Sequence, residues 1–293
     1  MPINITEKMI KAIPHSCLVK LQAVYDSLKT AEKKAADLLL ERPKFFAGAT
    51  IVEAAEQAGC SEATLVRLSR KLGFGGYPEL KDALSCDKEE HPIGLYSNIK
   101  ETDDNITIAT KVFTASIQAL SDTLNIIDKG EYEKAVDAIG GCNKILFYGS
   151  GDAATVAQSG YQKFVRAGFD VQASVDIDIQ LISVSHMKKG DVFVAISHSG
   201  RTKNILDVVK YARAKGITVI SITNFPVSPL AKNSDIILCT AAFAEHVNGE
   251  VISKRITELC ILESLYVNVL IKHRSDLLKK IEISNFALEI NKL

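Results

Sequence analysis

The stretch Asp191-Val-Phe-Val-Ala-Ile-Ser-His-Ser-Gly-Arg-Thr202 decides the fold of this chain. An apolar run leads directly into hydroxyl residues and a glycine, and apolar residues then recur at helical spacing from Lys203 to Lys215. A short apolar run bounded in this way predicts a buried strand of a parallel sheet, followed here by a helix. The polar residues therefore lie in a strand-to-helix turn.

This turn has the composition of an anion site. Free backbone N–H groups and the positive end of the helix dipole meet at a helix N-terminus, and Gly200 lets the backbone approach a ligand closely. The hydroxyls of Ser197, Ser199 and Thr202 add donors, and His198 can add another. The alternative is an ordinary Ser/Thr helix cap. Because a cap needs only one hydroxyl, we expect a phosphate site.

Strands and helices alternate through the second half of the chain. The expected strands are 144–148, 170–174, 191–196, 217–222 and 235–239. This alternation predicts a parallel sheet with helices on both faces. Residues 17–86 show only helical patterns, and residues 105–140 predict two further helices. The fold class is therefore α/β, with an all-α N-terminal domain and a C-terminal domain built on a five-stranded, doubly wound parallel sheet.

The first strand of this sheet also ends in small and hydroxyl residues, Gly149-Ser-Gly151. In doubly wound sheets, ligands bind beyond the carboxyl ends of the strands, where the strand order reverses. A flavodoxin-like order of 2-1-3-4-5 puts this reversal between the first and third strands, so that both turns face one crevice. Since Ala154 stands where the pattern GxGxxG would have its third glycine, we expect no nucleotide cofactor, and no other cofactor is indicated.

The N-terminal half contains two short amphipathic helices, expected at 50–58 and 62–72 and separated by Gly59. Ser61 is a favourable N-cap for the second helix, whose apolar face consists of leucines at helical spacing. Two short helices joined by a tight glycine turn are typical of a helix-turn-helix, whose second helix enters the major groove of DNA.

The other face of the second helix carries the residues expected to contact DNA. The expected DNA contacts begin with Ser61 at the N-cap. Thr64 and Arg67 lie in the first turns, where base edges are reached, and Arg can pair with guanine through two hydrogen bonds. Arg70 and Lys71 suit phosphate groups, as does Lys81 further along the chain. The alternative is a plain helical hairpin with a solvated basic face.

Composition limits the class of protein. The 293 residues are 47% hydrophobic and carry a formal net charge of zero. Residues 1–86 hold 12 Lys or Arg against 10 Asp or Glu, so placement rather than total charge favours DNA. Six cysteines without a CxxC or Cys/His cluster indicate neither a zinc site nor a disulfide framework. No apolar run approaches the ~20 residues that span a membrane. We expect a cytoplasmic protein with domains at 1–86 and 105–293 and a polar linker at 87–104.

The second half resembles a SIS (sugar isomerase) domain, an α/β fold that binds sugar phosphates. The resemblance covers about residues 105–275. It rests on Gly149-Ser-Gly151, on Ser197-x-Ser-Gly-x-Thr202 and on Arg255-Ile-Thr-Glu-Leu259. It implies that Ser150 and the hydroxyls of the 197–202 turn bind the phosphate or the sugar hydroxyls. The expected ligand site also includes Gly149, His198, Gly200 and Glu258.

The N-terminal half resembles the DNA-binding domain of RpiR-type bacterial transcriptional regulators. The resemblance rests on residues 27–43 and on Cys60-Ser-Glu-Ala-Thr-Leu-Val-Arg-Leu-Ser-Arg-Lys-Leu-Gly-Phe-Gly-Gly-Tyr77. Those regulators join this domain to a SIS domain in the same order. The resemblance implies a regulator of carbohydrate metabolism genes rather than an enzyme. It also implies a dimer or tetramer that binds operator DNA and a sugar-phosphate effector, in the cytoplasm at the nucleoid.

Glu258 has three interpretations. An aldose–ketose isomerase needs a base, usually Glu or His, and the candidates are Glu258, Glu263, His246 and His198. The regulators that this chain resembles usually carry Gln at position 258. The carboxylate could be a base, an acceptor for a sugar hydroxyl, or a contact in a dimer.

Two other functions stay open. The chain could be a sugar-phosphate isomerase whose N-terminal helices serve assembly. It could also be a DNA-binding protein whose SIS domain only dimerises, although the hydroxyl residues at two strand ends speak against this. For the effector, the resemblance offers amino-sugar phosphates such as N-acetylmuramic or N-acetylmannosamine 6-phosphate, pentose or hexose phosphates, and keto-deoxy-gluconate phosphate.

Overall fold

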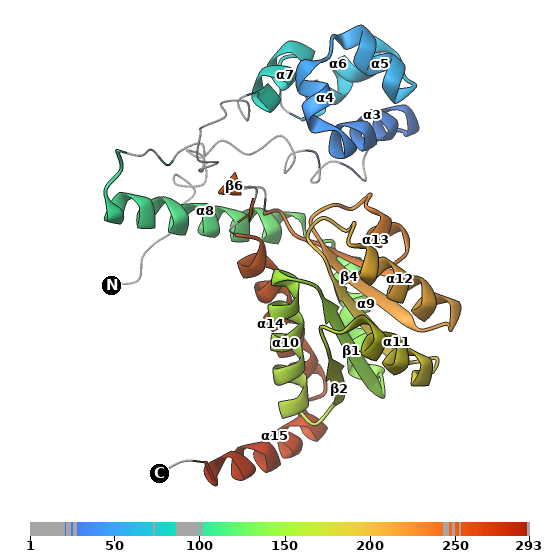
Figure 1. Cartoon of the computed structure of the whole chain (residues 1–293), viewed down its shortest axis with the longest axis vertical. Coiled ribbons are helices and arrows are strands. Elements are labelled where there is room, and N and C mark those ends of the chain that lie inside the picture. Colours follow the sequence, from blue (N-terminus) through green and yellow to red (C-terminus); the bar gives the residue numbers. More distant parts are fainter. Residues whose placement is uncertain are drawn as a thin grey trace. The chain divides into compact units, whose positions relative to one another are not determined.

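The structure is a computed structural model, and it describes residues 21, 25, 28–72, 74–85, 99, 102–242, 246–247, 250–251 and 253–291. The chain divides into two compact units (Figure 1). The first unit consists of Met1–Ile126 and Ala241–Ser253, and the second consists of Ile127–Thr240 and Lys254–Leu293.

The second unit is built on a five-stranded sheet with the order β2-β1-β3-β4-β5, and all its strand pairs are parallel. The predicted fold class, the five strands and their order are confirmed. The strands are β1 (Lys144–Gly149), β2 (Asp170–Ala173), β3 (Val192–Ile196), β4 (Thr218–Thr223) and β5 (Ile236–Cys239).

Helices cover both faces of this sheet because alternate strand residues point to opposite sides. Ile145 and Phe147 belong to a buried cluster with α9, α10 and α14, whereas Leu146 and Tyr148 belong to one with α11, α12 and α13. Figure 1 shows the two layers on either side of the strands. The helices are α9 (Lys129–Gly141), α10 (Asp152–Arg166), α11 (Ile177–His186), α12 (Lys203–Ala214), α13 (Pro229–Lys232), α14 (Lys254–Lys272) and α15 (Arg274–Glu289).

The first unit contains the predicted helix-turn-helix. Its second helix, α6, begins directly after Ser61, whose hydroxyl accepts a hydrogen bond from the backbone N–H of Thr64. Gly59 ends the preceding helix in the left-handed conformation, with φ +62°, which glycine adopts without steric cost. The helices are α3 (Thr30–Glu41), α4 (Pro43–Gly48), α5 (Ile51–Ala58), α6 (Glu62–Lys71) and α7 (Tyr77–Ser85).

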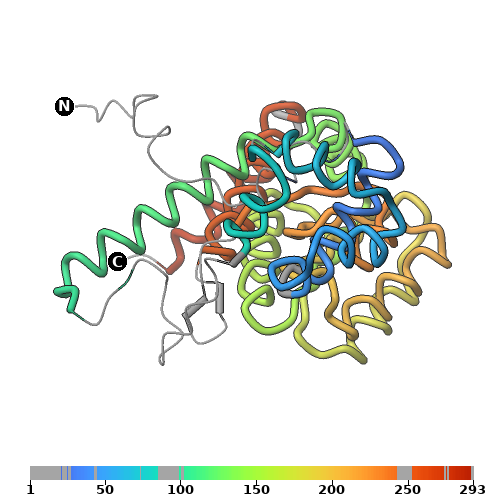
Figure 2. Tube along the Cα trace, turned by 90° about the horizontal axis from the view of Figure 1, so that it is seen from above, coloured from blue at the N-terminus to red at the C-terminus, as the bar shows by residue number. Residues whose placement is uncertain are grey.

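The boundaries of the two units differ from the predicted domains. The long helix α8 (Asn105–Ile126), which is unbroken in Figure 2, belongs to the first unit together with residues 241–253. Ala119 of this helix shares a buried cluster with Ala242, and Thr123 Oγ1 accepts a hydrogen bond from the Ala241 N–H (3.0 Å). The same segment contains the antiparallel pair β6 (His246–Val247) and β7 (Glu250–Val251). The predicted linker at 87–104 lies outside the described residues, except for 99 and 102–104.

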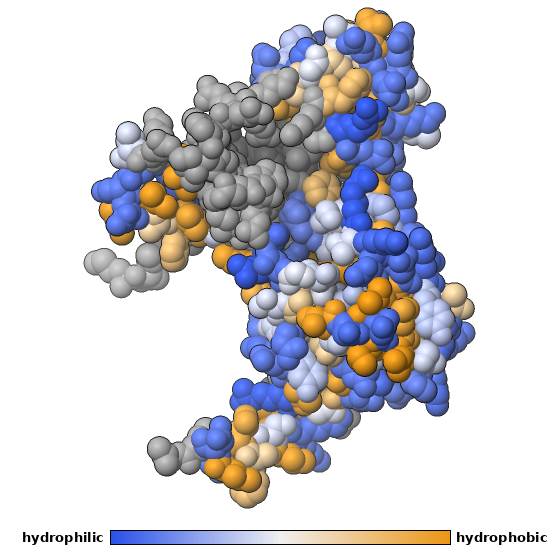
Figure 3. All heavy atoms as spheres, viewed as in Figure 1, coloured by the Kyte–Doolittle hydropathy of each residue, from blue (hydrophilic) through white to orange (hydrophobic). Residues whose placement is uncertain are grey.

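Exposed apolar side chains gather around α11 and on α15 (Figure 3). They are Val175, Ile179 and Ile182 around α11, and Leu278, Ile283, Phe286, Leu288 and Ile290 on and just after α15. Clustered apolar surface of this kind often marks an interface. None of the described helices is long and apolar enough to cross a membrane.

An ion pair joins α3 to α6 in the first unit. Lys71 Nζ lies 2.8 Å from Glu32 Oε2, and the same oxygen accepts the backbone N–H of Lys29 at 2.8 Å. The Glu32 side chain is only 4% exposed and that of Lys71 is 37% exposed. The hydrogen bond from Lys71 holds the pKa of Glu32 below its ordinary value.

Glu32→Ala should lower the free energy of unfolding by about 1–3 kcal/mol, because it removes the hydrogen bonds from Lys71 and from the Lys29 backbone. The loss should be smaller than for a fully buried ion pair, because the partly exposed Lys71 can return to water. Urea unfolding followed by circular dichroism measures this, with Glu41→Ala, an exposed glutamate of the same helix, as the control. Because the Glu32 pKa is depressed, the difference from wild type should be full above pH 4.5 and fade as the pH falls further. Equal unfolding midpoints for the two variants at pH 7 would contradict this role.

Candidate functional site

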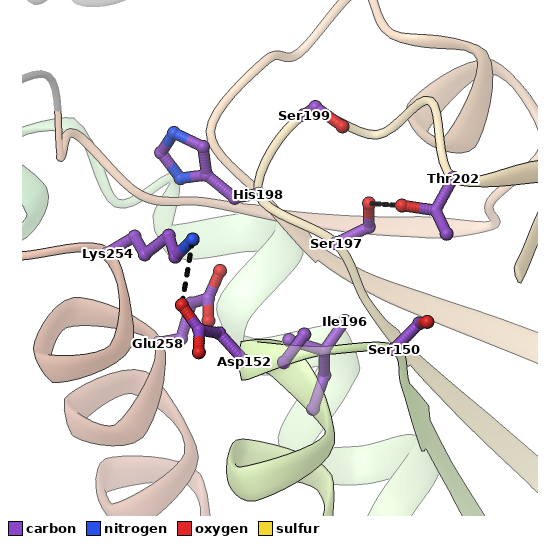
Figure 4. Close-up of a pocket in the computed structure, with 10 residues that line it drawn as sticks. Ser150, Asp152, Ile196, Ser197, His198, Ser199, Thr202, Lys254 and Glu258 are labelled. Atoms are coloured by element: carbon purple, nitrogen blue, oxygen red, sulfur yellow. Dashed lines mark hydrogen bonds and ion pairs between the residues drawn. The ribbon is translucent and has the colours of Figure 1, made fainter. Parts of the chain in front are cut away.

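A cavity of about 200 Å³ lies at the carboxyl ends of β1 and β3 (Figure 4). Gly149, the last residue of β1, pairs in register with Ile196, the last residue of β3, so the two following turns leave the sheet side by side. The predicted convergence of these turns on one crevice is confirmed. The lining residues are Ser150, Asp152, Ala153, Ile196, Ser197, His198, Ser199, Thr202, Lys254 and Glu258.

The 197–202 turn is fixed by hydrogen bonds to the end of β4. The Ser197 N–H donates to the Ile222 carbonyl, and the Asn224 N–H donates to the His198 carbonyl, both at 3.0 Å. Thr223 Oγ1 donates to the same His198 carbonyl at 3.2 Å. The turn therefore has a defined shape before any ligand binds.

The hydroxyls of this turn are not used as ordinary helix caps. Thr202 is the N-cap residue of α12, but its side chain makes no capping hydrogen bond. Its Oγ1 instead lies 3.1 Å from Ser197 Oγ, as Figure 4 shows. Ser199 is exposed, and its Oγ accepts the backbone N–H of Arg201 at 3.3 Å. The hydroxyls therefore gather at the N-terminus of α12, where a helix favours an anion.

Two charged lining residues were not predicted from the sequence. Lys254, the first residue of α14, places its Nζ 3.0 Å from Oδ2 of Asp152, the first residue of α10. Arg255 lies at 4.0 Å from the same carboxylate. Asp152 directly follows the Gly149-Ser-Gly151 motif, and Lys254 directly precedes the motif that begins at Arg255. The two residues form an ion pair only when α10 and α14 pack together.

Glu258 lies one turn further along α14 and is 1% exposed. Its Oε1 has no hydrogen-bond partner among the described residues. Burial raises the pKa of its carboxyl to about 8, and the neighbouring Asp152 also raises it, against the opposing effect of Lys254. A side chain buried within its own chain offers no surface for a dimer contact, so that interpretation is wrong.

The other candidate bases lie elsewhere. Glu263 is 41% exposed and forms an ion pair with Lys163 at 3.0 Å. His246 belongs to β6 in the first unit. Of the titratable side chains considered from the sequence, the cavity therefore brings together Glu258 and His198.

Some of the predicted DNA-contacting residues are exposed in the structure, and others make contacts within the first unit. Arg67 and Arg70 are exposed on α6, as expected. The prediction that Thr64 lies on this open face is wrong, because Thr64 is only 2% exposed. Its Oγ1 lies 2.9 Å from Ser61 Oγ and accepts a hydrogen bond from Arg67 Nη2 at 3.2 Å. Thr64 therefore orients the arginine.

The two lysines also have partners within the first unit. Lys71 pairs with Glu32, as described above. Lys81 Nζ donates to the Gly48 carbonyl at 3.2 Å, which joins α7 to the end of α4. Their charge remains near the helix-turn-helix, but each side chain is held by a structural contact.

The fold and the cavity define a class of protein in which a helix-turn-helix unit is joined to a sugar-isomerase-type domain. Comparison with known proteins agrees: residues 15–90 match the helix-turn-helix domain of the rpiR family, and residues 139–268 match the SIS domain. An HTH-type transcriptional regulator of Caldanaerobacter subterraneus is 30% identical over 94% of this chain and 98% of its own. HexR, an HTH-type transcriptional regulator of Pseudomonas aeruginosa, is 30% identical over 88% of this chain and 90% of its own.

The chain belongs to the RpiR family of HTH-type transcriptional regulators. Among solved structures, the NanR protein of Vibrio vulnificus, complexed with ManNAc-6P, has the same fold. Its TM-score is 0.62 at 24% identity, over 93% of this chain and 97% of that chain. Structures similar to the SIS half include proteins of Listeria monocytogenes and Bacteroides fragilis that have been proposed to be sugar-phosphate or phosphosugar isomerases.

Gly200→Ala tests whether the shape of the 197–202 turn is built into the fold. Gly200 has φ +61°, and a Cβ there would lie 2.1 Å from Ser228 Oγ. Gly216→Ala is the matched control, because Gly216 has φ +75° but open space around the added atom. The control should lose about 1–2 kcal/mol of stability from the left-handed backbone. Gly200→Ala should lose about 1–3 kcal/mol more from overpacking. Chemical denaturation measures both, and equal losses would contradict the close packing.

Proposed function

We propose that this regulator senses a phosphorylated sugar in the cavity between β1 and β3, and that ligand binding changes its affinity for operator DNA. The observation that carries the proposal is the set of hydroxyls that two strand ends bring to one cavity, beside Lys254. Hydroxyl donors, a helix N-terminus and an ammonium group together suit a phosphate. The remaining lining residues leave room for the sugar.

The DNA-binding part of the proposal rests on α6. Arg67 and Arg70 are exposed on this helix, and Thr64 holds Arg67 through a hydrogen bond. In the proposed complex, Arg67 reads a base edge while Arg70 and the nearby Lys71 and Lys81 attract phosphates. The chain acts as a dimer or tetramer, so that its symmetry matches that of a near-palindromic operator. The exposed apolar side chains of α11 and α15 support self-association.

The two activities are linked by thermodynamics. If the effector changes the affinity for DNA, DNA changes the affinity for the effector by the same factor. A coupling of about 1–3 kcal/mol, or roughly 5–150-fold, is ordinary for such proteins. The proposed targets are genes of carbohydrate metabolism, bound in the bacterial cytoplasm at the nucleoid.

Fluorescence anisotropy at fixed salt tests the proposal directly, because salt alone changes protein–DNA affinity strongly. The DNA fragments come from the region upstream of this gene and its neighbours, with scrambled duplexes as controls. The ligand panel contains N-acetylated amino-sugar phosphates, pentose and hexose phosphates, and keto-deoxy-gluconate phosphate. We expect one compound to shift specific DNA binding. Equal DNA affinity across the whole saturating panel would overturn the proposed control.

Sugar-phosphate isomerisation is the second candidate function, and the buried carboxyl of Glu258 in the cavity is the observation that favours it. A base must be ionised to take a proton from carbon. Burial raises the pKa of Glu258 to about 8, so most of it is neutral at pH 7. This argues for the sensor. Incubation with aldose and ketose phosphates distinguishes the two, since interconversion that is lost in Glu258→Gln would establish the enzyme.

Arg67→Ala should weaken binding to the operator by about 10–100-fold, because it removes a base contact of about 1–3 kcal/mol. Binding to a scrambled duplex should change much less, and effector binding should not change. Lys34→Ala removes an exposed cation of α3 outside the helix-turn-helix pair and serves as the control. Unchanged operator affinity in Arg67→Ala would reject the base-reading role.

Ser199→Ala should weaken effector binding by about 10–100-fold, since a hydrogen bond to a charged group contributes about 1.5–3 kcal/mol. Operator binding without effector should be unchanged. Thr155→Ala, an exposed hydroxyl of α10 that does not line the cavity, is the control. Titration calorimetry and anisotropy measure the two activities separately. A normal response of Ser199→Ala to the effector would show that this hydroxyl does not bind the phosphate.

A further inference from the structure

The cavity is lined by hydroxyls and by a buried carboxyl. Its hydroxyls come from the turns after β1 and β3, whereas Glu258 enters from α14 and is 1% exposed. Figure 4 shows its carboxyl group beside Asp152 and Lys254. Oε1 of Glu258 has no hydrogen-bond partner among the described residues. A buried polar atom without a partner costs about 1–3 kcal/mol, so a ligand that supplies a partner for it gains affinity.

The charged and titratable groups around Glu258 come from three elements. α10 contributes Asp152, α14 contributes Lys254 and Arg255, and the turn after β3 contributes His198. The nearest ammonium, Lys254 Nζ, lies 3.0 Å from Asp152 and both cationic residues pair with that carboxylate. Ionised Glu258 would be a buried carboxylate beside the half-buried carboxylate of Asp152, which raises the cost of its charge.

We propose that Glu258 is protonated in the free protein and donates a hydrogen bond from its neutral carboxyl to an uncharged oxygen of the bound sugar. This rests on the proposed sugar-phosphate site and names the part of the ligand that faces Glu258. The ligand carries a hydroxyl, carbonyl or amide oxygen at this position rather than an ammonium group. A neutral amine at this position would instead take the proton from Glu258, and an ammonium group would favour release of that proton to solvent; either way an ion pair would form. The buried position, which raises the pKa of Glu258 to about 8, supports this protonation.

The proposal predicts how ligand affinity depends on pH. Below pH 8 the neutral form dominates and affinity should be constant, apart from ionisation of the ligand phosphate. Above pH 8 each further pH unit should weaken binding about tenfold, because a proton must be taken up. Between pH 7 and 9 the expected loss is about tenfold. Glu258→Gln keeps a neutral donor of the same shape and should bind equally at both pH values.

The first experiment needs no ligand. Infrared difference spectra of the full-length protein, wild type minus Glu258→Gln, should show the C=O stretch of a protonated carboxyl at pH 7, and this signal should fade between pH 7 and 9. Glu263→Gln, on the same helix but exposed and ion-paired, should show no such signal. An ionised Glu258 at pH 7 would overturn the proposal, whatever the ligand proves to be.

The second experiment uses titration calorimetry with glucose 6-phosphate, N-acetylglucosamine 6-phosphate, N-acetylmannosamine 6-phosphate and glucosamine 6-phosphate. Among the compounds that bind, those without an amino group should lose affinity for the wild type above pH 8, but they should not lose affinity for Glu258→Gln. His198 is present in both proteins, so the comparison isolates Glu258. A preference for the ammonium sugar that falls tenfold or more in Glu258→Gln at pH 7 would overturn the proposal. Failure of every phosphorylated sugar to bind would count against the sensor function. The infrared result would still report the protonation of Glu258, because it needs no ligand.

Discussion

The parallel pairing of β1 with β3 is the constraint on which the rest of the site depends. Hydrogen bonds along these two strands bring Gly149 opposite Ile196, so that turns from distant parts of the sequence leave the sheet at the same edge. The strand order reverses at this pair, because β2 lies beyond β1 and β4 lies beyond β3. The following helices consequently diverge to opposite faces, and a cavity remains between their N-termini. A different neighbour for β1 would separate its hydroxyl turn from that of β3.

The chemistry of this cavity follows from the hydrogen-bonding and charged groups that line it. The hydroxyls and the N-terminus of α12 carry partial positive charge toward the opening, which suits an anion. Lys254, which lines the same cavity, is held by Asp152. Glu258 lies beside this pair, and its Oε1 has no hydrogen-bond partner among the described residues. The cavity therefore combines hydroxyls, a helix N-terminus, an ammonium group and a buried carboxyl, and in the proposed function these groups hold the phosphate and the sugar of one ligand.

The sequence predicted the parts that depend on local pattern. The apolar runs located all five strands, and the composition of two turns located the cavity between them. Long-range contacts were beyond its reach. Lys71 was predicted as a phosphate ligand, but its partner Glu32 lies on another helix that only folding brings near. Thr64 was placed on the open face, yet it packs inward because Ser61 and Arg67 both use its hydroxyl. Lys254 was not predicted as a lining residue, because only the packing of α14 against α10 in the folded chain brings it to the cavity.

The path of the chain gives the proposed sensor a physical basis. Residues 241–253 belong to the first unit with α8, and the next residue, Lys254, lines the cavity of the second unit. In the proposed mechanism, a phosphate that attracts Lys254 competes with Asp152 for it, at the point where the chain passes from one unit to the other. A ligand shifts an equilibrium only through contacts that differ between two states. In the proposed sensor the Lys254–Asp152 pair would be such a contact, because an anionic ligand and the carboxylate would share the same ammonium group.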